Sequence, residues 1–156
     1  MTSYINQWRL EEKKINLIRD SQDPLLNLGH VISEINAANV QQQQLTEQLI
    51  QRLEKMGSFS NEIVAVEAMK VLVQSATQNA NTILPRAFLV TEVQEQLAQD
   101  RNRLSTIVQA LSQDDRELRF SSIKDPVVSD LLRKIKLLFG EIDSYIGMIQ
   151  REIAQI

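Results

Sequence analysis

The chain has 156 residues, of which 43% are hydrophobic and 24% are charged, and its formal net charge is −3 at pH 7. This length supports one domain with a hydrophobic core, and we expect residues 1–156 to form a single helical domain. The acidic balance argues against nucleic acid as a partner, and the absence of cysteine excludes disulfides, thiolate metal sites and cysteine nucleophiles. Aromatic residues make up only 4% of the chain, and the small numbers of Gly (4) and Pro (3) disfavour a β-rich fold.

Residues 3–21 form the first predicted helix. Its apolar positions lie at helical spacing but are interrupted by Glu11 and Glu12. Trp8 is the single tryptophan of the chain and has two interpretations. It either anchors this helix to the rest of the bundle or is an exposed hot spot for a protein partner.

Residues 24–56 form the second predicted helix. Asp23 is a favourable N-cap, Pro24 suits the first helical position, and Gly57 is a typical C-terminal residue beyond a helix. The heptad stripe is apolar at both ends and polar in the middle, where Gln41–Gln44 lie. Two interpretations remain open for this run: a turn that is solvated or faces a gap between neighbouring helices, or a polar layer that fixes register or oligomeric state.

Residues 60–83 form the third predicted helix, with Ser58 or Ser60 as its expected cap. Pro85 disfavours helical geometry at Leu84, and we favour a tight break here over a continuous kinked helix. The fourth predicted helix spans residues 85–112. Asp100 interrupts its apolar stripe, and its spacing predicts a local ion pair with Arg103.

Residues 125–155 form the last predicted helix and carry the strongest pattern in the sequence. Asp125 and Pro126 repeat the capping pair that precedes the second helix. Three heptad positions are mostly apolar, which is a wider stripe than a two-stranded coiled coil needs and predicts neighbours on more than one side. These positions are Val128, Ile135, Ile142, Ile149 and Ile156 (a), Leu131, Leu138, Tyr145 and the polar Glu152 (d), and Leu132, Phe139, Ile146 and Ile153 (e).

Gly140 and Gly147 lie seven residues apart on the opposite side of this last helix. Glycine costs a helix up to about 1 kcal/mol relative to alanine, so the pair is either tolerated on the surface or admits a close neighbour. Leu137 and Met148 flank the glycines and make this face less polar than a solvated one. We therefore take Trp8, Leu137, Gly140, Gly147 and Met148 as candidate contact residues.

The short breaks between these segments place consecutive helices antiparallel. The expected fold is all-α: an elongated, antiparallel four-helix bundle of coiled-coil character with a short extra N-terminal helix. No full-length repeat is convincing in the sequence.

Catalytic and cofactor chemistry has little support in the sequence. His30 is the single histidine, and with Glu34 one turn later it lacks the spacing of helical di-iron sites. The four glycines are isolated, so no phosphate-binding loop is present. We predict no catalytic residues, no cofactor and no metal site, and we do not expect an enzyme.

The favoured function is a non-enzymatic protein that acts through protein–protein contacts, as an adaptor, a chaperone or a subunit of an assembly, with a protein partner or copies of itself. One alternative is a ligand-sensing bundle that binds a small molecule between helices. Another is a secreted, membrane-active helical protein, although membrane contact is not favoured. No apolar run is long enough to span a bilayer, and no signal peptide is visible, so a cytoplasmic location is favoured over secretion without a signal peptide.

Overall fold

The computed structural model describes residues 23–111 and 118–155. Within these ranges all regular secondary structure is helical. The long helices are α2 (Pro24–Met56), α3 (Ser60–Asn81), α4 (Val90–Ala110) and α5 (Pro126–Ile153), and two short 3-10 turns are η1 (Leu84–Arg86) and η2 (Phe120–Ser122). The predicted helix at residues 3–21 lies outside the described residues.

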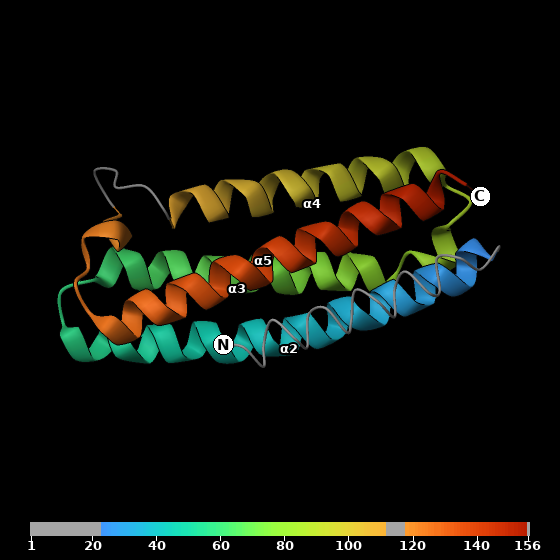
Figure 1. Cartoon of the computed structure of the whole chain (residues 1–156). Coiled ribbons are helices and arrows are strands. Elements are labelled where there is room, and N and C mark those ends of the chain that lie inside the picture. The colour runs from blue at the N-terminus through green and yellow to red at the C-terminus, as the bar shows by residue number, and fades with distance from the viewer. Residues whose placement is uncertain (1–22, 112–117, 156) are drawn as a thin grey trace.

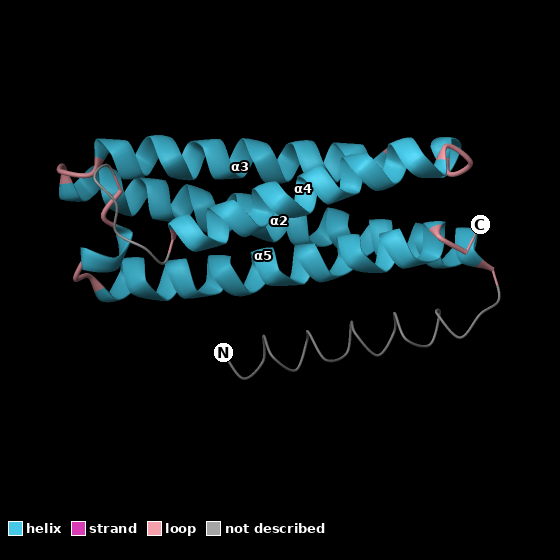
Figure 2. Ribbon diagram, turned by 90° about the horizontal axis from the view of Figure 1, so that it is seen from above, coloured by secondary structure: helices cyan, strands magenta, loops and turns pink. Residues whose placement is uncertain are grey.

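The long helices lie side by side along one axis, and each runs antiparallel to the next in the chain (Figure 1, Figure 2). Helix α2 packs against α3 and α5, and α4 packs against α3 and α5. Helices α2 and α4 therefore lie diagonally across the bundle from each other, and α3 and α5 each contact both of them. The predicted all-α, elongated antiparallel bundle is confirmed.

Side-chain caps set the N-terminal ends of α2 and α5. The Asp23 carboxylate accepts hydrogen bonds from the backbone N–H groups of Leu25 and Leu26, at 3.0 and 3.4 Å. Asp125 accepts in the same way from Val127 and Val128, at 3.0 and 3.1 Å. Both predicted caps are therefore confirmed. They could be predicted from sequence because the aspartate accepts hydrogen bonds from N–H groups only two and three residues further along the chain.

The C-terminal end of α2 also follows its prediction. Gly57 adopts a left-handed conformation with φ 78°, and its N–H donates to the carbonyl of Leu53. Side chains other than glycine rarely adopt this conformation, so the glycine ends the helix.

The ends of α3 and α4 differ from the sequence prediction. Phe59 is the N-cap of α3 and supplies no side-chain hydrogen bond, so neither Ser58 nor Ser60 acts as the cap. The predicted break at Pro85 is confirmed, since α3 ends at Asn81 and Pro85 lies in η1. Helix α4 begins at Val90, five residues later than predicted, because η1 and the residues after it turn the chain back along the bundle.

The core follows the heptad stripe of α5. Every a, d and e position of α5 from Val128 to Ile153 is buried, including the polar Glu152. Burial on three heptad positions requires partners on two sides, which α2 and α4 provide. The core is completed from the other helices by Leu28, Val31, Ile35, Leu49, Leu53, Val66, Val73, Leu97 and Leu104.

Candidate binding surfaces

The candidate contact residues of α5 do not share one surface. Leu137 is 45% exposed, and Gly140, one turn later, is exposed with open space where a side chain would begin. Met148 is buried instead, and Gly147 lies beneath the side chain of Arg101 from α4. Trp8 lies outside the described residues. Leu137 and Gly140 therefore form the part of this predicted contact that is open to a partner, and its use as a contact stays a prediction.

The side chain of Arg101 on α4 forms hydrogen bonds to two residues of α5. Its Nε and Nη2 donate to the two carboxylate oxygens of Asp143, at 2.9 and 3.0 Å, and its Nη1 donates to Oε1 of Gln150 at 2.9 Å. The bond to Asp143 holds the pKa of Arg101 above its ordinary value. Asp143, Gly147 and Gln150 lie on one face of α5, with the glycine between the two residues that Arg101 binds. Because Gly147 has no side chain, the guanidinium can lie directly on the helix at this point.

A second ion pair joins α2 to the start of α5. The Nη2 of Arg52 lies 2.6 Å from Oδ2 of Asp125, the residue that also caps α5. The hydrogen bond from Arg52, followed by those from the α5 backbone, holds the pKa of Asp125 below its ordinary value. The same carboxylate thus fixes both the end of α5 and its position on α2.

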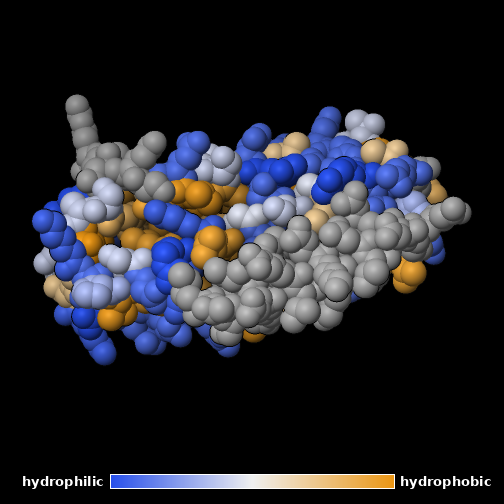
Figure 3. Space-filling model, viewed as in Figure 1, coloured by the Kyte–Doolittle hydropathy of each residue, from blue (hydrophilic) through white to orange (hydrophobic). Residues whose placement is uncertain are grey.

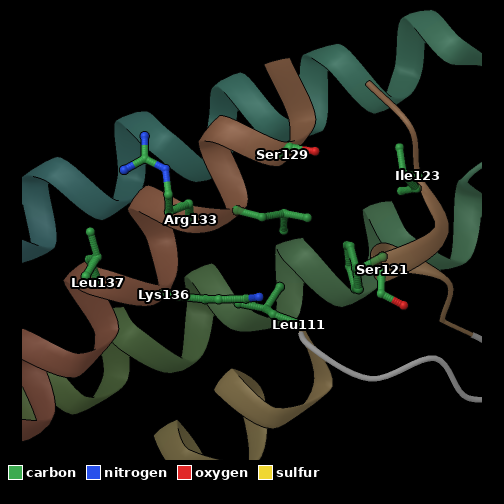
Figure 4. Close-up of a pocket in the computed structure, with 9 residues that line it drawn as sticks. Leu111, Ser121, Ile123, Ser129, Arg133, Lys136 and Leu137 are labelled. Atoms are coloured by element: carbon green, nitrogen blue, oxygen red, sulfur yellow. The ribbon is translucent and has the colours of Figure 1, made fainter. Parts of the chain in front are cut away.

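A pocket of about 440 Å³ opens where the end of α4, η2 and the first half of α5 meet (Figure 4). In the view of Figure 3, hydrophobic atoms are exposed in this region between α4 and α5. Apolar side chains make up most of its wall, and the polar ones are two serines and two cations. The lining residues are Leu111, Phe120, Ser121, Ile123, Ser129, Leu132, Arg133, Lys136 and Leu137.

The two cations of this pocket are placed differently. The side chain of Lys136 extends across the pocket toward Leu111, whereas the guanidinium of Arg133 points away from Lys136 (Figure 4). Arg133 and Lys134 both pair with Asp130 on the adjoining turn of α5, and these pairs hold the pKa of Asp130 below its ordinary value. Within residues 23–111 and 118–155, no carboxylate oxygen lies within 4.0 Å of the Lys136 ammonium.

Three polar residues of the helix stripes, Gln42, Asp100 and Glu152, are buried inside the bundle. Gln42 is fully buried; its Nε2 donates to Asn39 at 3.0 Å and to the carbonyl of Lys70 on α3 at 3.5 Å, and its Oε1 has no hydrogen-bond partner. Of the two interpretations of Gln41–Gln44, a solvated turn is therefore wrong at Gln42. Gln44, two residues later, is exposed, so the run has a buried side and a solvated side.

Asp100 is buried as well. It accepts hydrogen bonds from Asn79 of α3 at 3.3 Å and from Gln96 at 3.2 Å. These amides take the place of the predicted ion pair with Arg103, which is exposed. The prediction was wrong because helical spacing places Arg103 within reach, but Asp100 faces the interior, where α3 offers a donor.

Asn27 and Glu152 form a buried polar contact at the other end of the bundle. Nδ2 of Asn27 donates to Oε2 of Glu152 at 3.2 Å, which joins the first turn of α2 to the last turn of α5. Both side chains would lose their hydrogen bond if α5 shifted by one turn along α2. This pair therefore helps to specify how the two helices are aligned.

Possible metal ligands do not cluster among the described residues. His30 lies 3.8 Å from Glu34, one turn along α2, and this distance is too long for a hydrogen bond. Over the residues that the structure describes, no group of three His, Cys, Asp or Glu side chains is arranged to hold a metal ion. Among the same residues, no helix combines the length and apolar character needed to cross a membrane.

Sequence reasoning missed a group of exposed apolar residues at one end of the bundle, which we call the apolar end: Leu25, Leu26, Leu84, Phe88 and Leu89. Phe88 is 80% exposed and Leu26 is 58% exposed. The first turn of α2 and the η1 turn lie together at this end, where α2 contacts η1 (Figure 1). The apolar run around Pro85 was visible in the sequence, but assigning residues 85–112 to a helix placed it in a regular stripe rather than in a turn.

Comparisons with known proteins identify no relative. No protein-family model matches the chain, and neither the comparison with curated proteins nor that with solved structures finds a match.

Proposed function

We propose that this chain is a non-enzymatic helical protein that acts through protein–protein contacts, and that the apolar end is its principal contact surface. The observation that carries this proposal is the exposure of Phe88. A phenylalanine that is 80% exposed, among four leucines that are also exposed, is a large apolar area to leave in water. Aromatic residues are enriched at protein interfaces because each buries a large area with little loss of conformational freedom.

The polar surroundings of the apolar end favour a protein partner over a lipid surface. Helices that lie on membranes combine an apolar face with several lysines or arginines, which bind anionic headgroups. Here Arg86 is the cation within η1, and it donates to the carbonyl and hydroxyl of Thr82. Asp23 and Glu92 add negative charge near the same end. Arg151 in the last turn of α5 is a second cation at this end, so the described charges around the apolar end are balanced and provide no cluster of cations for anionic headgroups.

The test replaces Phe88 by aspartate in the full chain and compares it with Val71→Asp. Val71 is also exposed, at 62%, but lies in the middle of α3, away from the apolar end. We expect both variants to keep the helical circular dichroism spectrum of the parent. Phe88→Asp should lose self-association, measured by light scattering over a concentration series, or lose the partners captured from the native host.

The comparison of the two variants decides the proposal. Equal association of the parent and Phe88→Asp would overturn it, as would an equal loss in Val71→Asp, which would indicate general stickiness rather than a defined surface. Flotation of the parent with liposomes, abolished by Phe88→Asp, would assign the apolar end to a lipid surface and would also overturn it.

A further inference from the structure

The pocket between α4, η2 and α5 carries an inference that is independent of the apolar end. We propose that it binds a small molecule with an apolar body and one negative charge, such as a medium-chain or aromatic carboxylate. The body would lie against Ile123, Leu132 and Leu137, and the carboxylate would bind the ammonium of Lys136.

The wall of the pocket is suited to an apolar body. Leu137 is 45% exposed at the pocket, Ile123 and Leu132 present the small exposed parts of two core side chains, and Leu111 and Phe120 are each only 1% exposed. A volume of about 440 Å³ lies within the range of roughly 300–1,000 Å³ that is usual for small-molecule sites. Such sites are mostly apolar and contain a few polar groups that fix the orientation of the ligand.

The positive charge of Lys136 favours a ligand with a negative charge. Lys136 reaches across the apolar wall toward Leu111 (Figure 4), and no described carboxylate lies within 4.0 Å of its ammonium. Arg133, by contrast, pairs with Asp130 and points away. A single ammonium matches one negative charge, while the hydroxyls of Ser121 and Ser129 can accept or donate further hydrogen bonds.

The extent of the pocket favours a small molecule over a partner helix. Along α5 its lining runs from Ser129 to Leu137, a rise of about 12 Å at 1.5 Å per residue. The η2 turn, with Phe120 and Ile123, forms one of its walls. A groove that receives a helix would need to continue along α4 and α5, but among the described residues only Leu111, the C-cap of α4, lines the pocket from that side.

The experiment titrates the full-length protein with octanoate and, separately, with octan-1-ol, and follows the methyl NMR signals of Leu111, Ile123 and Leu132. We expect octanoate to shift these signals in a saturable manner. Lys136→Met keeps the apolar stem and removes the charge, so its affinity for octanoate should fall by about tenfold or more, while its affinity for octanol changes by less than about twofold. Lys134→Met is the control, because Lys134 pairs with Asp130 and does not line the pocket.

Several results would overturn the proposal. These are the absence of saturable shifts at the pocket methyl groups up to millimolar octanoate, unchanged octanoate affinity in Lys136→Met, or an equal loss in Lys134→Met. Shifts of the same signals that follow protein concentration without octanoate would show that a second copy occupies the pocket. Shifts caused by an acidic amphipathic peptide, but not by octanoate, would assign it to a protein partner.

Discussion

The guanidinium of Arg101 lies directly on Gly147, so that a Cβ at this glycine would be only 3.1 Å from Nη1. Helix α4 buries few side chains of its own, namely Val93, Leu97, Asp100 and Leu104. Its attachment to α5 therefore depends in part on the bonds from Arg101 to Asp143 and Gln150. The glycine leaves room for these bonds, because the guanidinium would have to shift by a few tenths of an ångström to admit a Cβ in its place.

The two glycines of α5 should respond differently to alanine. Gly140→Ala should raise the free energy of unfolding by up to about 1 kcal/mol, because alanine is the better helix former and its Cβ meets open space. Gly147→Ala should gain less or lose stability, because Arg101 must shift by a few tenths of an ångström within its bonds to Asp143 and Gln150 to admit the Cβ. Urea denaturation of the two variants measures the difference. An equal gain in both would show that Arg101 adjusts without cost.

The pairing of Asp125 with Arg52 predicts a pH-dependent stability. The folded protein holds the pKa of Asp125 below its ordinary value of about 3.9, so the ionised form stabilises the fold. This stabilisation is complete above pH 4 to 5 and is lost as the pH falls through the lowered pKa. Asp125→Asn keeps a favourable N-cap and removes the charge. Its unfolding midpoint should lie below that of the parent at pH 7, and the difference should shrink below pH 4.

Salt provides the control for this prediction. Arg52 is partly exposed, so its attraction to Asp125 is screened by ions, and the difference at pH 7 should decrease in 1 M NaCl. A difference between the parent and Asp125→Asn that does not shrink as the pH falls from 7 toward 2 would contradict the assignment, because protonation of Asp125 removes the charge that distinguishes the two side chains.

Gln42 should be replaceable by leucine. Its side chain is fully buried and one oxygen has no partner, which makes the burial of this amide costly. Gln42→Leu should leave the free energy of unfolding unchanged or raise it by about 1 kcal/mol, and Gln44→Leu, on the exposed side, should change it by less than about 0.5 kcal/mol. Light scattering on the same samples shows whether the amide also controls oligomeric state. A loss of several kcal/mol in Gln42→Leu would mean that its bonds to Asn39 and Lys70 dominate.

The buried stripe of α5 predicts which side-chain truncations destabilise the fold. Ile142 and Leu104 are buried on facing helices, and Ile142→Ala and Leu104→Ala should each lower the free energy of unfolding by about 2–5 kcal/mol. Leu137→Ala serves as the matched control, because nearly half of this side chain is already in water and its loss should cost far less. Chemical denaturation checks all three. An unchanged midpoint in Ile142→Ala would show that the register of α5 is wrong.

The sequence by itself determined the ends of α2, the start of α5 and the buried side of α5. Asp23, Gly57 and Asp125 act on backbone groups within three or four residues, so consecutive residues contain all the information that is needed. The same holds for the a, d and e positions of α5, since helical periodicity alone decides which side chains face inward.

Only the tertiary structure decided which helix surfaces are exposed to solvent or to a binding partner. Leu111 and Leu132 belong to different helices, and the pocket between them depends on how α4 and η2 settle against α5. Gly147 and Gly140 occupy the same heptad position, yet one lies under Arg101 and the other faces open space, because α4 passes over one of them. Periodicity fixes the direction of a side chain from its own helix axis, whereas exposure depends on the neighbouring helix, whose placement results from packing over the whole bundle.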